Sequence, residues 1–158
     1  MAKTSRTKGA RGEREAAALL REALPDGWTV ERFGTGEAGH DLRLLSPKGK
    51  LSPFAIEVKR YADFEVGEAC RGSARFRAWW RQARAQADRA GREPVLLTRG
   101  DRRPWWLWSV RQYGDPECLI ELRIPIAEEP ISECVIGVPL DQAIADLANE
   151  IREGADHG

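Results

Sequence analysis

The stretch "FAIEVKRYAD" (residues 54–63) has the composition of a buried strand that ends in charged residues. Four of its first five residues are apolar, yet Glu57 and Lys59 stand on either side of Val58. Because side chains alternate between the two faces of a strand, Glu57 and Lys59 should point to the same side. Burying a carboxylate and an ammonium group costs free energy unless a partner compensates them. The stretch therefore predicts either an internal ion pair or a chemical site at the end of a buried strand.

The preceding segment, "HDLRLLS" (40–46), supplies a second acid for the same place. If it pairs antiparallel with a strand over 51–59 through the "PKGK" turn, one register pairs Asp41 with Glu57 and residue 46 with residue 52. Two adjacent carboxylates repel each other unless a cation lies between them. Carboxylate oxygens suit Mg²⁺ or Mn²⁺ better than zinc. The alternative is an ordinary salt-bridge cluster of Asp41, Glu57 and Lys59.

A coarse pass along the chain predicts helices that alternate with short strands. Helix formers, apolar periodicity and Gly or Pro stops define the expected elements. The order is typical of an α/β or α+β protein with helices packed on a sheet. The expected elements are a helix over 12–24, strands over 28–33, 40–46 and 51–59, a helix over 73–91, strands over 93–99, 104–110, 119–126 and 134–140, and a helix from Asp141.

Charge is divided unevenly along a chain whose net charge is zero. Residues 1–113 hold 23 Lys and Arg against 14 Asp and Glu, whereas residues 114–158 hold 2 against 11. The first part thus suits a polyanionic partner, unless both parts are ordinary solvated surfaces. We expect a flexible basic arm over 1–10, a core over 11–113, and an acidic extension over 114–158. Its many branched apolar residues predict that the extension packs on the core or in a dimer.

Composition is that of a soluble globular protein rather than a membrane protein. The chain has 158 residues, of which 42% are hydrophobic and 32% are charged, and no apolar run is long enough to span a bilayer. Cys70, Cys118 and Cys134 are widely spaced and form no obvious disulfide set. We therefore expect a cytoplasmic protein with no membrane partner.

Glu13 is a third candidate acid. It follows the basic arm and lies near the start of the first expected helix. In that place it could simply interact favourably with the helix dipole.

Several of these features together resemble a known family. Asp41, fifteen intervening residues and then "EVK" (57–59) look like the motif of PD-(D/E)XK nucleases. "KGARGERE" (8–15) resembles the first helix of Holliday junction resolvases of the archaeal Hjc type, and Arg32 followed by "GTG" resembles their Arg- and Ser-containing loop. The resemblance covers about residues 8–110. The Trp-rich later segments look more like phage-encoded members.

The chain departs from that family at three places. His40 stands where the motif has Pro, and Thr35 replaces a Ser but keeps a hydroxyl. The acidic extension over 114–158 has no counterpart that we can assign, which affects the expected dimer geometry.

The resemblance implies a restriction-endonuclease-like αβββαβ core with a mixed central sheet flanked by helices. It also implies a Mg²⁺-dependent endonuclease, with Mn²⁺ as a substitute, that resolves four-way DNA junctions as a homodimer. Glu13, Asp41, Glu57 and the Val58 carbonyl would hold the metal, and Lys59 would position or activate the attacking water. Phosphodiester hydrolysis would leave 5′-phosphate and 3′-hydroxyl ends. Candidate DNA-binding residues are Lys3, Arg6, Lys8, Arg11, Arg32, Thr35 and Arg60.

Other functions fit parts of the same pattern. A nicking or restriction-type nuclease would share the acids and the lysine. A DNA-binding accessory protein without catalysis would use the basic residues but would not need carboxylates beside a phosphate. A protein-interaction module would use the acidic extension. A salt titration of DNA binding would separate this alternative from the other two, because such a module should not bind DNA.

Overall fold

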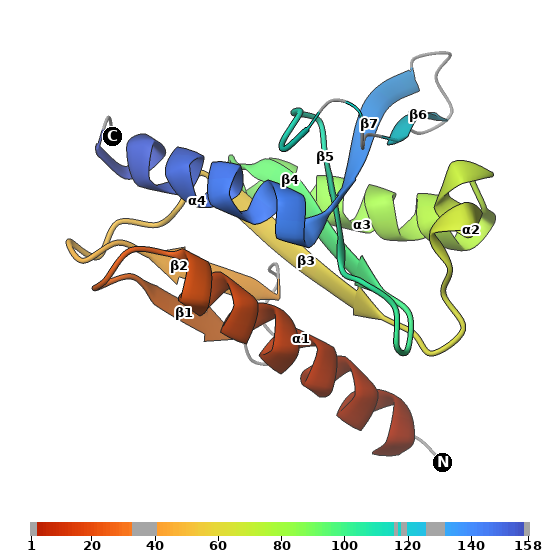
Figure 1. Ribbon diagram of the computed structural model, residues 1–158, viewed down its shortest axis with the longest axis horizontal. Coiled ribbons are helices and arrows are strands. Elements are labelled where there is room, and N and C mark those ends of the chain that lie inside the picture. The colour runs from red at the N-terminus through yellow and green to blue at the C-terminus, as the bar shows by residue number, and fades with distance from the viewer. Residues whose placement is uncertain (1–2, 33–40, 116, 118–119, 126–131, 157–158) are drawn as a thin grey trace.

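A mixed β-sheet with helices on both faces forms the centre of the computed structural model (Figure 1). The structure describes residues 3–32, 41–115, 117, 120–125 and 132–156. In these residues the sheet has seven strands, in the order β1-β2-β3-β4-β5-β7-β6. The elements are α1 (Lys3–Ala23), β1 (Thr29–Arg32), β2 (Leu42–Leu45), β3 (Phe54–Arg60), α2 (Val66–Cys70), α3 (Ala74–Ala90), β4 (Glu93–Arg99), β5 (Trp106–Ser109), β6 (Ile120–Pro125), β7 (Ser132–Pro139) and α4 (Leu140–Asp156).

The α+β architecture predicted from the sequence is confirmed. The order α1, three strands, α3 and β4 reproduces the expected αβββαβ core. Strands β3 and β4 are parallel, with Glu57 opposite Leu96, and the other strand pairs are antiparallel. Helix α3 begins after Ser73, whose hydroxyl accepts the Phe76 N–H, and ends at Gly91 with φ 62°. The short helix α2 was not predicted.

Helix α1 begins earlier than the sequence predicted. It starts at Lys3, so most of the expected flexible arm over 1–10 is helical backbone in the structure. The segment contains no Pro, and a helix extends readily from an established helical segment. Gly12 lies where α1 comes close to β3, and a Cβ there would be only 2.7 Å from the Cβ of Arg60. The glycine therefore allows the helix to pass directly over the strand that holds Glu57 and Lys59.

The register between β2 and β3 is confirmed at one end and wrong at the other. Leu42 pairs with Ile56, which is the register expected from Asp41 and Glu57. Near the turn, however, Leu45 bridges Leu51. Three positions separate the two pairs on the first strand and five on the second, so the segment with Pro53 bulges. Pro53 has no N–H for the ladder, which explains why regular pairing stops there.

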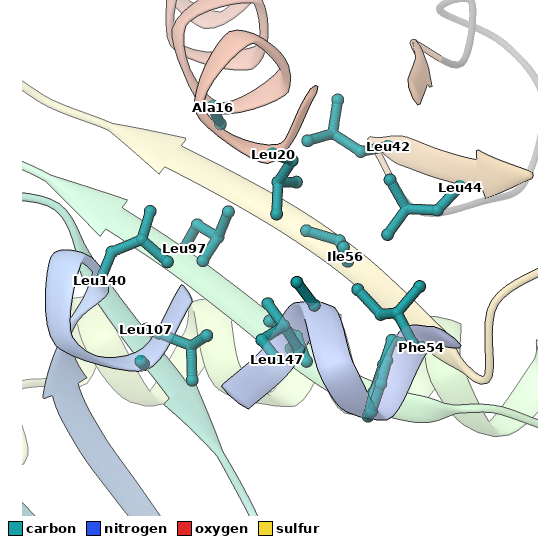
Figure 2. Packing of buried hydrophobic residues seen from close by; sticks show 14 of the residues in the cluster. Ala16, Leu20, Leu42, Leu44, Phe54, Ile56, Leu97, Leu107, Leu140 and Leu147 are labelled. Carbon is teal, nitrogen blue, oxygen red and sulfur yellow. The ribbon is translucent and has the colours of Figure 1, made fainter. Parts of the chain in front are cut away.

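Two hydrophobic cores lie on opposite faces of the sheet. Helices α1 and α4 cover one face, as Figure 1 shows, and α3 with α2 covers the other. Figure 2 shows the first core, where side chains from α1, α4 and four strands converge: Ala16, Leu20, Leu42, Leu44, Phe54, Ile56, Leu97, Leu107, Leu140 and Leu147. The second core includes Trp79 and Trp80, which are only 7% and 1% exposed. Both tryptophans of the adjacent pair are therefore buried within this chain.

The acidic extension is built into the same sheet. Strand β7 pairs with β5 on one side and with β6 on the other. Gly137 of β7 lies against Trp108, and a Cβ at this glycine would be 2.2 Å from the indole ring. Glu133 of β7 accepts hydrogen bonds from Trp80 Nε1 at 2.9 Å and Arg84 Nη1 at 2.8 Å. One acid of the extension thus neutralises an arginine of the basic part.

Truncation after Val110 should leave an insoluble protein. Without the extension, the edge of β5 and the apolar surface under α4 would be exposed, and both favour aggregation. Expression of residues 1–110 beside the full chain, followed by measurement of the soluble fraction, checks this expectation. A soluble, folded truncation would show that the extension is dispensable.

Within the described residues, no helix is both long enough and apolar enough to cross a membrane.

Candidate active site

Three elements bring the predicted acids and the lysine to one end of the sheet. Asp41 immediately precedes β2, Glu57 and Lys59 lie on β3, and Glu13 lies on α1. A pocket of about 270 Å³ opens there, lined by Gly9, Glu13, Asp41, Val58, Lys59, Arg60, Tyr61, Ala62 and Asp63. Because β3 and β4 are parallel, their carboxyl ends and the loops that follow them lie at this same end of the sheet.

The end of β3 is held by hydrogen bonds from both neighbouring elements. The Val58 N–H donates to Asp41 Oδ2 at 2.8 Å, which fixes the carboxylate of Asp41 beside the strand. Lys59 Nζ donates to Glu57 Oε1 at 2.5 Å, so the two side chains lie on the same side as predicted. Gln82 Nε2 of α3 donates to the same Glu57 oxygen at 2.7 Å. Glu57 is 1% exposed, and its other oxygen, Oε2, is buried without a hydrogen-bond partner among the described residues.

The effect of this arrangement on charge is seen in the pKa of Asp41. Burial, reinforced by the negative charge of Glu57, raises the pKa of Asp41 from the ordinary value of 3.8 to about 7. The hydrogen bond from Val58 and the charge of Lys59 act in the opposite direction, but they do not offset the burial. Asp41 therefore lacks a positive charge sufficient to offset its burial.

Glu13 is positioned by an arginine rather than by the helix terminus. Arg32 donates to Glu13 Oε2 through Nε at 3.0 Å and Nη2 at 2.7 Å. Because α1 begins at Lys3, Glu13 is not in the first helical turn, and the helix-dipole explanation for it no longer applies. Among the described residues, no three Asp, Glu, His or Cys side chains form a ready metal cluster. The structure therefore brings Asp41 and Glu57 together, with Glu13 at the wall of the pocket and paired to Arg32.

Most of the arginines expected to bind DNA are engaged in ion pairs. Arg11 is 64% exposed and pairs with Glu15 at 2.9 Å. Arg60 is only 12% exposed and lies between Glu15 at 3.3 Å and Asp101 at 2.8 Å. These two ion pairs give Arg60 a structural role that the sequence did not indicate. Lys3, Arg6 and Lys8 belong to the first turns of α1, where the structure describes the backbone alone, and Thr35 and His40 lie outside the described residues.

Sequence reasoning missed the contribution of Gln82. A parallel β3–β4 connection requires a helix that packs back over the two strands, and α3 makes this connection. A polar residue on α3 beside the apolar stripe could have been suspected of reaching β3. Its partner could not have been identified, because the angular position of the helix depends on packing against Trp108 and the sheet.

Comparisons with known proteins find related sequences and a distantly similar solved structure. A family model described as "Phage putative PDDEXK endonuclease" matches residues 4–111. Protein D14 of Escherichia phage T5 is 33% identical over 119 residues, a match that covers 66% of this chain and 70% of D14. The solved structure of Archaeoglobus fulgidus Hjc, a Holliday junction resolvase from an archaeal hyperthermophile, matches with a TM-score of 0.44 and 18% identity over 90% of this chain and 97% of Hjc.

An acid before one strand and an acid-x-lysine motif on its neighbour are the defining features of a nuclease of the PD-(D/E)XK type. The chain belongs to the family of phage PDDEXK endonucleases. The family model's match over residues 4–111 agrees with the span of about 8–110 predicted from the sequence, and the acidic extension over 114–158 lies beyond it.

Stability should depend on pH through Asp41. Between about pH 4 and pH 7 the folded protein keeps a proton on Asp41 that the unfolded chain has lost, so the free energy of unfolding falls as the pH rises across this window. Asp41→Asn removes that dependence. Melting temperatures of both proteins in EDTA, measured from pH 4 to pH 8, should therefore diverge, with wild type losing more stability toward pH 7. Parallel curves would contradict the raised pKa of Asp41.

Proposed function

We propose that this protein is a Mg²⁺-dependent endonuclease that cuts branched DNA, in particular four-way junctions, and that it acts as a homodimer. The observation that carries the proposal is the pair of neighbouring carboxylates, Asp41 and Glu57, beside Lys59 at a pocket. Nuclease chemistry is a property of the family. What we propose beyond the family is the dependence on Mg²⁺, the preference for four-way junctions and the homodimer.

The residues present fit a divalent cation. Glu57 Oε2 is a buried carboxylate oxygen without a hydrogen-bond partner among the described residues, and Asp41 has no positive charge sufficient to offset its burial. Both are the oxygen donors that Mg²⁺ and Mn²⁺ prefer. Asp41, Glu57 and the Val58 carbonyl would hold the ion, with Glu13 available if it parted from Arg32. When bound, the ion would make a water molecule more acidic and offset charge on the scissile phosphate.

Lys59 would act on the water or on the phosphate. Its side chain is 17% exposed and lines the pocket, and its ammonium group is held by Glu57 at 2.5 Å. In this position Lys59 can orient an attacking water through a hydrogen bond, or hold a non-bridging phosphate oxygen as negative charge grows on it. Gln82 would keep Glu57 in place from α3, which makes it a positioning residue.

Substitution of Gln82 should slow cleavage without unfolding the protein. Gln82→Ala removes one of the two donors that orient Glu57, and loss of such a supporting partner typically costs about 10- to 100-fold in activity or metal affinity. The metal dependence of the cleavage rate should shift to higher Mg²⁺ concentration. Gln86→Ala, one turn later on α3, is the matched control and should behave as wild type. Equal rates for both variants and wild type would exclude a positioning role for Gln82.

A branched substrate and a dimer agree with the charge pattern and the family. The excess of Lys and Arg in residues 1–113 suits contacts to phosphates, which carry no sequence information. A four-way junction presents two equivalent strands, and a symmetric dimer would place one site on each. As a phage-family nuclease it would meet this DNA in the host cytoplasm.

Synthetic substrates test the proposal. A four-way junction, a flap and a continuous duplex of matched sequence are each incubated with the full chain, once with Mg²⁺ and once with EDTA. We expect paired cuts in the junction with Mg²⁺ and no cuts in EDTA. Preferential cutting of the duplex would instead identify a nicking or restriction-type nuclease. Binding without cleavage of any substrate would identify an accessory protein.

A further inference from the structure

Tyr61 is an exposed aromatic side chain at the wall of the catalytic pocket. Among the described residues, just two large hydrophobic side chains are exposed: Tyr61, at 45%, and Leu51, at 39%. Tyr61 lies two positions after Lys59 and lines the same pocket as Asp41 and Lys59. Leu51 lies before the opposite end of β3 and does not line this pocket. An exposed ring so near a phosphate-cutting site requires a physical explanation.

The backbone of Tyr61 is fixed by neighbouring elements. Its N–H donates to the Arg99 carbonyl at 3.0 Å, which continues the pairing of β3 with β4 by one residue. Its carbonyl accepts the Phe64 N–H at 3.1 Å, which closes a turn. The ring is therefore carried by the rigid end of the sheet and not by a loose loop.

A second aromatic ring supports that of Tyr61 from behind. Trp79 of α3 is buried and stacks on Tyr61, with ring centroids 5.0 Å apart and an interplanar angle of 26°. The guanidinium of Arg75 lies 5.9 Å from the Tyr61 ring and 5.4 Å from the Trp79 ring, and Asp63 and Glu68 hold it there. One face of Tyr61 is thus covered, while almost half of the residue stays open to solvent. This arrangement fixes the ring in one orientation before any partner binds.

We propose that Tyr61 is a stacking platform for a nucleobase exposed at the branch point of the DNA, next to the phosphate that is cut. Every base in a continuous duplex is sandwiched between its neighbours, whereas a branch point can present a base with a free face. A preorganised ring backed by Trp79 gains stacking energy from such a base at little entropic cost. The platform would therefore favour branched DNA over duplex. The inference rests on the proposed function and adds a residue that selects the substrate.

A double-mutant cycle between the ring and the base tests this contact. The full chain and its Tyr61→Leu variant are titrated with a four-way junction and with junctions that each carry one abasic nucleotide at a branch-point position, in Ca²⁺ so that binding is read without cleavage. Tyr61→Leu keeps an apolar cover over Trp79 but removes the aromatic face. We expect it to weaken binding to the intact junction by roughly 5- to 150-fold, the range for one base–aromatic stack. At the position that stacks, the abasic junction should lose nothing further.

Matched variants separate stacking from packing. Tyr61→Phe should bind the intact junction within about twofold of wild type, because the ring and not the hydroxyl makes the contact. Leu51→Ala, the other exposed large hydrophobic side chain, should also match wild type. Light scattering and circular dichroism check that Tyr61→Leu keeps the oligomeric state and the fold of wild type. A change of oligomeric state in this variant would assign Tyr61 to a protein contact and overturn the proposal.

The outcomes distinguish this inference from the proposed function. If Tyr61→Leu weakens binding to every abasic junction by the same factor as to the intact junction, the ring contacts none of the bases tested. That result would overturn stacking, even if wild type cuts the junction with Mg²⁺. Conversely, absence of cleavage by wild type would count against the proposed function, while the binding cycle would still report whether Tyr61 meets a base.

Discussion

Asp41→Asn and Glu57→Gln should each reduce cleavage with Mg²⁺ by more than about 100-fold, because loss of even a supporting partner of a metal ligand costs up to that much. Each substitution removes a charged carboxylate from the Asp41–Glu57 pair and keeps nearly the same side-chain shape. In Asp41→Asn the new amide oxygen can still accept the Val58 N–H, and in Glu57→Gln it can still accept hydrogen bonds from Lys59 and Gln82. The fold should therefore survive while the cation loses a charged donor.

Measurements of DNA binding should distinguish loss of the metal site from loss of substrate binding. Binding of each variant to the four-way junction in EDTA at pH 8, above the pKa of Asp41, should be equal to or tighter than that of wild type when measured by fluorescence anisotropy, since one repulsive charge near phosphate is gone. Asp88→Asn and Glu65→Gln replace exposed acids that pair with Arg84 and Arg103, and both should cut at the wild-type rate. Undiminished cutting by Asp41→Asn in EDTA would exclude a metal-holding role for Asp41.

Lys59→Ala should lower the cleavage rate by about 100- to 10,000-fold, the range for loss of a positioned acid–base group, with little change in substrate binding. The charge of Lys59 is needed most when negative charge develops in the transition state. The fold should be retained, because Glu57 Oε1 still accepts Gln82 at 2.7 Å after the lysine is removed. Single-turnover rates at saturating enzyme separate the chemical step from binding.

Two observations control the Lys59 experiment. Lys48→Ala removes an exposed lysine from the turn before β3 and should cut as wild type does. If Lys59→Ala loses its fold by circular dichroism, Lys59 is mainly the ion-pair partner that keeps buried Glu57 compensated. That result would favour the structural salt bridge over the catalytic role.

Much of the architecture could be predicted because local signals agreed with tertiary packing. The start signal of α3, the N-cap Ser73, and its stop signal, Gly91, act within one turn of the helix, so the sequence was sufficient to place its ends. Strand alternation was likewise sufficient to put Glu57 and Lys59 on one side of β3, and the distance between them confirms it. The register near Asp41 followed from the positions of the charged residues.

Other features depended on contacts between distant segments. The start of α1 could not be read from its basic and small residues, because they favour a helix only weakly and the adjoining helical segment extends into them. The bulge at Pro53 depended on which N–H groups the ladder needed at that point. Arg60 was predicted to bind DNA, and the sequence did not indicate that Glu15 and Asp101, both distant from it along the chain, hold it in an ion-pair network.

The sequence by itself thus determined the residue types of the site and their order, because a strand fixes the faces of its own side chains. Only the tertiary structure decided which side chains from other elements hold these residues in place. Arg32 reaches Glu13 across the sheet edge, Gln82 reaches Glu57 from α3, and Trp79 supports Tyr61 beside Lys59. Each of these contacts joins segments whose relative positions are set by the burial of apolar faces. Burial is a sum over many residues, so no short motif could encode those partners.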